Sequence, residues 1–132
     1  MRKTATCIAL GMLIAAGPAL AHHPFSSEFD VNAPLSLSGK VTQIEWNDPH
    51  VIVHVAVNDQ SGQTWNWSFE AASPQTLEGK GWTRTTLKDG DQITVRGYRA
   101  KSEPFVAAAR MIELPGGKKL LAADDNDGGP KI

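Results

Sequence analysis

Apolar and polar residues alternate with a period of two along most of the chain, which is the pattern of β-strands. Every second residue from 51 to 57 is a valine, so one face of a strand over residues 50–57 is expected to lie in the core. Turn-forming residues follow at 58–62, and residues 64–70 alternate again. The two alternating segments are therefore predicted to form a β-hairpin.

An earlier strand is predicted over residues 34–46, where the alternation changes phase once. The apolar positions switch faces between Val41 and Ile44, close to Gly39. One extra residue in a strand causes such a switch, so the pattern predicts a β-bulge.

A short helix and further strands are predicted after the hairpin. Ser73 and Pro74 have the character of an N-cap and a first helical residue, and Gly79 or Gly81 is expected to end the helix. Strands are predicted over residues 92–98 and 105–114, with a short addition over 118–122.

The predicted order of elements is strand, strand, strand, helix, strand, strand. This order, with a bent first strand, predicts an all-β domain with one short helix, built as a small OB-fold-like Greek-key barrel. A sequential meander or sandwich is the alternative that the same strands permit.

The first 21 residues have the organisation of a cleaved secretory signal. Arg2 and Lys3 precede an apolar run from 7 to 16, and Ala19-Leu20-Ala21 has the small-residue spacing of a cleavage site. The apolar run is shorter than the roughly 20 residues that span a bilayer. We therefore expect a periplasmic protein without a stable membrane anchor, whose mature chain begins at His22.

The mature chain is expected to form one domain over residues 22–122, followed by a disordered, acidic, glycine-rich tail over 123–132. Two of the 13 basic residues belong to the signal, which leaves 11 against 14 acidic residues and a net charge of about −3. This charge argues against nucleic acid as a partner. The single cysteine, Cys7, lies inside the signal, so no disulfide is expected.

The new N-terminus is the first candidate site, for a metal ion. His22 would offer its α-amine and its imidazole, and His23 or His50 would supply a third nitrogen, a donor set that suits Cu(II). His54 is excluded as a partner of His50, because four residues along a strand span about 13 Å. The alternative is a solvated terminus that binds nothing.

The segment from Trp46 to His50 is the second candidate, because loops at the mouth of a barrel often bind ligands. Trp46 and Asn47 are the residues that would contact a ligand or partner there. The competing interpretation is structural, with Asn47 forming the turn and Trp46 covering the core.

A group of basic residues is the third candidate, with Arg84 and Arg99 as its principal members. If they converge, they could hold a carboxylate or phosphate of a small molecule. Pairing with Glu70 and Glu78 is the alternative.

Three aromatic residues at alternate positions lie in the second strand of the hairpin. A row of this kind can serve as a stacking platform, but in a small hairpin it is more typical of the core. We therefore predict a core role for Trp65, Trp67 and Phe69.

Several short segments stand out as a set across nearly the whole mature chain. They are Ala21-His22-His23-Pro24-Phe25, Glu28-Phe29-Asp30, Gly39-Lys40-Val41, Glu45-Trp46-Asn47-Asp48-Pro49-His50, Trp67-Ser68-Phe69-Glu70, Ser73-Pro74, Gly81-Trp82-Thr83-Arg84, Leu87-Lys88-Asp89-Gly90-Asp91 and Gly97-Tyr98-Arg99-Ala100-Lys101. Together they resemble a family of exported proteobacterial proteins, domain of unknown function 6152. The resemblance implies export and a small β domain, and it implies no reaction.

The sequence contains no phosphate loop, nucleophile elbow or zinc-helix motif. A non-enzymatic binding or accessory protein, with copper or another transition metal as its ligand, is the function that we predict. The alternatives are a module for a small anion or a periplasmic partner protein, and a copper-dependent redox enzyme.

Overall fold

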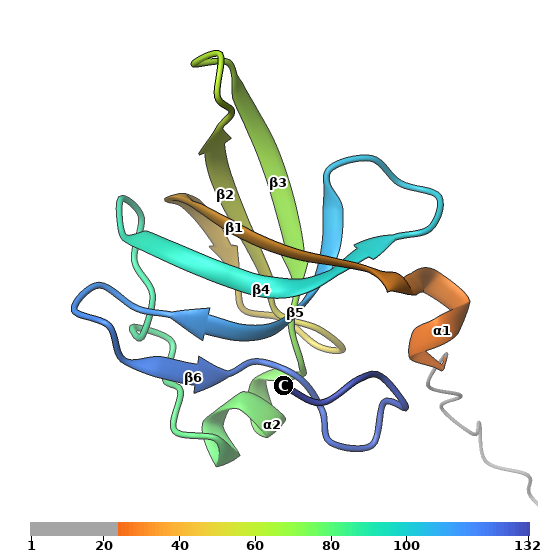
Figure 1. Ribbon diagram of the computed structural model, residues 1–132. Helices are drawn as coiled ribbons and strands as arrows, with labels where there is room; N and C mark the ends of the chain where they lie inside the picture. Colours follow the sequence, from red (N-terminus) through yellow and green to blue (C-terminus); the bar gives the residue numbers. More distant parts are fainter. Residues whose placement is uncertain (1–23) are drawn as a thin grey trace, which may run out of the picture.

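Six strands form one curved sheet in the computed structural model, which describes residues 24–132. Two short helices accompany them (Figure 1). In chain order the elements are α1 (Phe25–Glu28), β1 (Phe29–Glu45), β2 (Ile52–Asn58), β3 (Thr64–Glu70), α2 (Pro74–Gly79), β4 (Gln92–Ala100), β5 (Val106–Glu113) and β6 (Lys119–Leu121).

The long strand β1 belongs to both halves of the sheet. Its first part pairs with β4 as far as Lys40, and its second part pairs with β2 from Lys40 onward. Gly39 lies at this change of partner, where a β-carbon would come within 2.3 Å of the Ala56 carbonyl oxygen. The register shifts between Val41 and Gln43, which confirms the predicted bulge.

A parallel pairing between β3 and β5 closes the sheet. Ser68, Phe69 and Glu70 of β3 lie opposite Val106, Ala107 and Ala108 of β5. The strand order is β3-β2-β1-β4-β5-β6, and this additional pairing joins its first strand to its fifth. The result is a small barrel with the OB-type order of elements, as the sequence predicts.

The core fills the barrel and is mostly aliphatic. Val51, Val53 and Val55 are fully buried, which confirms the face predicted from the alternation. Trp67 and Phe69 are also in the core, whereas Trp65 is 40% exposed and does not belong to it. The prediction for that aromatic row is thus correct for two of its three members.

The helix α2 lies at one end of the barrel, near β6 (Figure 1). Its N-cap is Ser73, whose hydroxyl accepts a hydrogen bond from the Thr76 amide at 3.2 Å, and Pro74 opens the helix as predicted. Leu77 is fully buried on the core side. The helix α2 and the loop before it therefore close this end of the barrel.

A second, smaller apolar cluster lies apart from the main core. Phe25 of α1 and Phe29 pack with Ala108, and Tyr98 lies against Phe25 edge-on. The helix α1 was not predicted, and β1 begins at Phe29 rather than at residue 34. Packing of the two phenylalanines explains both differences, because it fixes a segment with no helical periodicity of its own.

Asp127 and Pro130 of the last ten residues, a segment that composition predicts to be disordered, contact β5. Arg110 of β5 is only 5% exposed, and its guanidinium bonds to the Asp127 carboxylate and the Pro130 carbonyl. The Phe25 amide donates to the Asp127 carbonyl at 3.0 Å. A buried charge requires partners of this kind, and they hold the tail in place.

The predicted signal, residues 1–21, lies outside the described residues. Within residues 24–132, no helix is long and apolar enough to cross a membrane.

Candidate functional site

His50 and Glu70 form a close pair on the surface of the barrel. His50 lies in the connection between β1 and β2, and Glu70 ends β3. Backbone hydrogen bonds join Val51 to Ala71 and Ala72 next to them, at 2.8 and 3.0 Å. His50 Nδ1 lies 2.8 Å from Glu70 Oε1, with the two side chains 42% and 23% exposed.

Three other elements influence the Glu70 carboxyl. Burial raises the pKa of Glu70, the charge of His50 opposes that shift, and the charges of Glu28 and Glu103 add to it. Glu28 belongs to α1 and Glu103 to the connection between β4 and β5. Because Glu70 also pairs in register with Ala108, which packs on Phe25, α1 lies on the same side of the barrel as Glu70.

His54 differs from His50 in that both of its ring nitrogens have partners. Nε2 lies 2.7 Å from Glu45 Oε2, and Nδ1 lies 3.0 Å from the Ser68 hydroxyl. For His50, the structure records a contact of Nδ1 alone among the residues it describes. Of the two histidines in residues 24–132, His50 therefore retains a ring nitrogen with which to bind a metal, and His54 does not.

His22 and His23 lie outside the described residues. Within residues 24–132, no three histidine, cysteine or acidic side chains are grouped closely enough to hold a metal ion. His50 and Glu70 alone are therefore too few ligands for a metal ion, and a metal site that includes them needs further donors.

The two residues predicted from the β1–β2 connection differ in burial. Trp46 is partly buried and packs against the main core, which is the structural role considered for it. Asn47 is exposed. The connection therefore offers Asn47 and His50 to the surface, with Trp46 turned toward the barrel.

Arg84 and Arg99 belong to different parts of the fold. Arg84 is exposed in the loop after α2, whereas Arg99 is near the end of β4. The Arg99 guanidinium lies over the Trp67 ring, 5.0 Å from its centre. No contact recorded for the described residues joins the two arginines or pairs either with Glu70 or Glu78.

An exposed aromatic pair lies next to Arg99 and was not predicted from the sequence. Trp65 and Phe105 stack with their ring centres 4.9 Å apart, and Phe105 meets Trp67 edge-on at 5.5 Å. The sequence pattern predicts Phe105 as the first residue of a strand, and nothing in that pattern indicates that its ring is exposed and stacked. Its positive φ of 58° is visible only in three dimensions.

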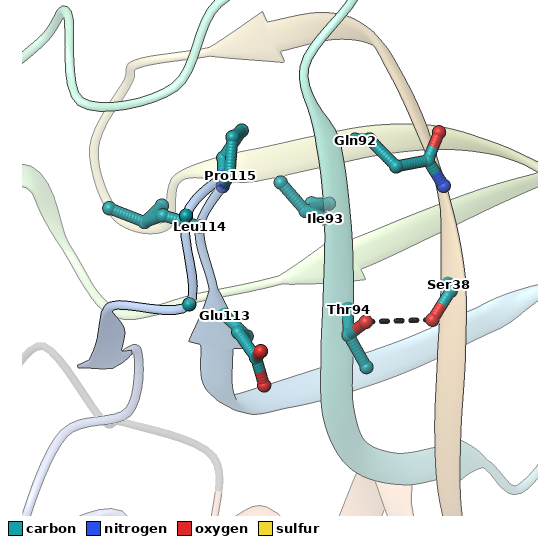
Figure 2. A pocket seen from close by; sticks show the side chains of 9 residues that line it. Ser38, Gln92, Ile93, Thr94, Glu113, Leu114 and Pro115 are labelled. Carbon is teal, nitrogen blue, oxygen red and sulfur yellow. Dashed lines mark hydrogen bonds between the residues drawn. The ribbon is translucent and has the colours of Figure 1, made fainter.

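A shallow hollow of about 360 Å³ lies between the start of β4 and the turn after β5 (Figure 2). The Ser38 and Thr94 hydroxyls hydrogen-bond to each other on its wall at 2.7 Å, as Figure 2 shows. Of the described residues that line it, Glu113 alone is ionisable. Neither the predicted residues nor a cluster of reactive groups lies there.

The strand order and the closing pairing define a small OB-type barrel with polar and aromatic groups on its surface. The chain belongs to a family of unknown function, DUF6152, whose model matches residues 10–106. No curated protein matches the sequence.

Among solved structures, the mitochondrial single-stranded DNA-binding protein Rim1 of S. cerevisiae is similar, with a TM-score of 0.46 and 12% sequence identity. The match covers 62% of this chain and 93% of that chain.

Proposed function

We propose that the protein is an exported, non-enzymatic binding domain that holds a late transition metal, with Cu(II) as the first candidate. The ligands in this proposal are the α-amine and imidazole of His22, the imidazole of His50, and His23 as an alternative donor. The observation that carries the proposal is the contact between His50 and Glu70.

A carboxylate beside one nitrogen of an imidazole is the usual arrangement around metal-ligating histidines. It orients the ring and makes the other nitrogen a better donor. At 2.8 Å from His50 Nδ1, Glu70 Oε1 supports this role, and the partly exposed ring leaves Nε2 accessible. The acidic charge of Glu70 and Glu28 also favours a cation on this side of the barrel.

In this proposal, the short segment before Phe25 brings the N-terminal donors to His50. Phe25 is anchored in the small apolar cluster, and α1 lies on the same side of the barrel as Glu70. His22 precedes Phe25 by three residues, which span at most about 10 Å. Pro24 has no amide hydrogen, so its backbone nitrogen does not compete for the metal.

A Cu(II) titration by calorimetry tests the proposal. The protein would be exported from cells so that cleavage leaves His22 at the terminus, and it would be compared with a version carrying an N-terminal Gly-Pro extension. We expect one-to-one binding that the extension weakens by about 10-fold or more, because it separates the α-amine from the His22 imidazole and its proline has no amide hydrogen to lose to a new chelate.

His50→Ala and His54→Ala form a matched pair for the same titration. We expect His50→Ala to reduce Cu(II) affinity about 10- to 100-fold and His54→Ala to leave it unchanged. Equal binding by the extended and native termini would exclude the terminal site. Equal effects of the two histidine variants would exclude His50 as a ligand.

A further inference from the structure

The aromatic platform consists of the exposed side chains of Trp65, Phe105 and Arg99 and of the buried Trp67 ring, which Phe105 and Arg99 contact. Trp65 is 40% exposed and Phe105 37% exposed, although large aromatic side chains gain most from burial. Each member lies within 5.5 Å of the next, measured between ring centres or from the guanidinium carbon to a ring centre. The platform is therefore continuous and combines apolar rings with one positive charge.

Specific bonds fix the orientation of the exposed rings. The Trp65 indole Nε1 donates to Asp59 Oδ2 at 2.9 Å. Phe105 holds a positive φ of 58°, a conformation that is strained for a residue other than glycine, and its carbonyl accepts from the Ser68 amide at 2.9 Å. Strain of this kind persists where surrounding contacts enforce it, and it is concentrated at ligand sites.

The two arginines that lie over aromatic rings differ in one respect. Arg110 lies 4.9 Å from the Phe25 ring centre, and its charge is neutralised by Asp127. Arg99 lies over Trp67 and is exposed, and no carboxylate of residues 24–132 is within ion-pair distance of it. An anion from solution can therefore approach the Arg99 guanidinium beside the rings.

We propose that the aromatic platform binds a small aromatic carboxylate. The ring of the ligand stacks on an outer face of the Trp65–Phe105 pair, and its carboxylate meets the guanidinium of Arg99, which suits planar two-point contact. This site is separate from the proposed metal site, and its ligand is different.

The charge of the chain and of the platform selects this class of ligand. A polynucleotide carries many phosphates and would be repelled by a domain with 14 acidic residues against 11 basic ones once Arg2 and Lys3 are set aside. A neutral sugar would use the rings and leave Arg99 without a role. A single ring with one carboxylate uses both features.

Titration with 2-naphthoate, beside its neutral analogue 2-naphthamide, tests the proposal by NMR of the indole N–H groups. For a ligand of this size we expect a Kd of about 1 mM for the naphthoate. The amide should bind about 5- to 10-fold more weakly, since it lacks the charge. The Trp65 indole resonance should shift most.

Arg99→Gln and Arg96→Gln are a matched pair on β4. We expect Arg99→Gln to lower naphthoate affinity to the level of the amide and Arg96→Gln to leave it unchanged. Trp65→Ala should weaken both ligands by about 10-fold. Because Trp65 and Arg99 are exposed, each variant is expected to keep the fold.

Three results would overturn the proposal. One is the absence of any shift of the Trp65 indole resonance at about 10 mM naphthoate, well above the expected Kd. The second is equal affinity for the acid and the amide, and the third is equal effects of the two arginine variants. Either of these last two would show that Arg99 does not recognise the carboxylate.

Discussion

The guanidinium of Arg110 meets the carboxylate of Asp127 through two hydrogen bonds and thereby joins β5 to the C-terminal segment. Arg110 is also the one charged side chain that is buried within residues 24–132. The same Asp127 accepts the Phe25 amide through its carbonyl at 3.0 Å. Both ends of the described chain are therefore held at one buried charge.

Asp127→Asn should destabilise the protein, because it leaves Arg110 buried without a compensating charge. Breaking a buried pair costs about 3–5 kcal/mol, and the 27% exposure of the Asp127 side chain lowers the expectation to about 2–3 kcal/mol. Denaturant unfolding measures the loss. Asp125→Asn is the control, since Asp125 is well exposed and its pair with Lys80 should matter little.

Hydrogen exchange distinguishes a local role of this pair from a global one. If the C-terminal segment holds α1, the Phe25 amide should exchange much faster in Asp127→Asn, by a larger factor than amides of β2. Uniform acceleration across the barrel would instead indicate that the pair stabilises the whole domain and has no special relation to α1.

Gly39→Ala should destabilise the barrel where β1 changes partner. A β-carbon there would lie 2.3 Å from the Ala56 carbonyl oxygen and 2.8 Å from Val55 Cγ1, so one of the strands must move. We expect a loss of about 2–3 kcal/mol in thermal or denaturant unfolding. Gly79→Ala is the control at an open position, with no atom within 4 Å, and should be neutral or slightly stabilising. A neutral Gly39→Ala would contradict the close approach.

Asp59 should make the orientation of Trp65 depend on pH in the acid range. Hydrogen bonds from Ser61, Trp65 and Gln63 lower the pKa of Asp59 to about 2. A lowered carboxyl pKa contributes stability that is complete above the unfolded value of 3.8 and is lost as the pH falls through about 2. The Trp65 indole N–H resonance should therefore titrate near pH 2. In Asp59→Asn this titration should be absent, and its persistence would assign it to another group.

Local alternation of apolar and polar residues was sufficient to predict the barrel strands. The position of the C-terminal segment depends instead on contacts between residues that are distant in the sequence. The valines of β2 and the turn that follows them are local signals, because burial of one face repeats every second residue. The C-terminal segment has the composition of a disordered tail. Its contacts with Arg110 and Phe25 join it to residues that no local pattern connects to it.

In the candidate sites too, the sequence indicated single residues but not the distant residues that they contact. Composition and position identified His50 and Arg99 as residues of interest, but their partners are distant in sequence: Glu70 for the first and Trp67 for the second. Arg84 and Arg99 were grouped because both are basic, and the fold assigns them to different elements. Phe105 was predicted only as the start of a strand, because its positive φ and its stack on Trp65 involve contacts that the sequence pattern does not show.

Glu70→Gln separates a role in metal binding from a role in stability, because the two effects should have opposite signs. Burial and the charges of Glu28 and Glu103 raise the pKa of Glu70 despite the attraction of His50. A carboxyl with a raised pKa contributes most below its unfolded value of 4.5, and that contribution is lost as the pH rises through the folded value. At neutral pH the Glu70→Gln variant should therefore unfold at higher denaturant concentration than the native protein, and this advantage should disappear below about pH 4.5.

The Cu(II) affinity of Glu70→Gln should nevertheless fall about 10-fold, because His50 loses the carboxylate that orients it. A variant that is both more stable and unchanged in Cu(II) affinity would show that Glu70 has no part in binding, and lower stability at neutral pH would show that the pair with His50 outweighs the cost of burying the charge.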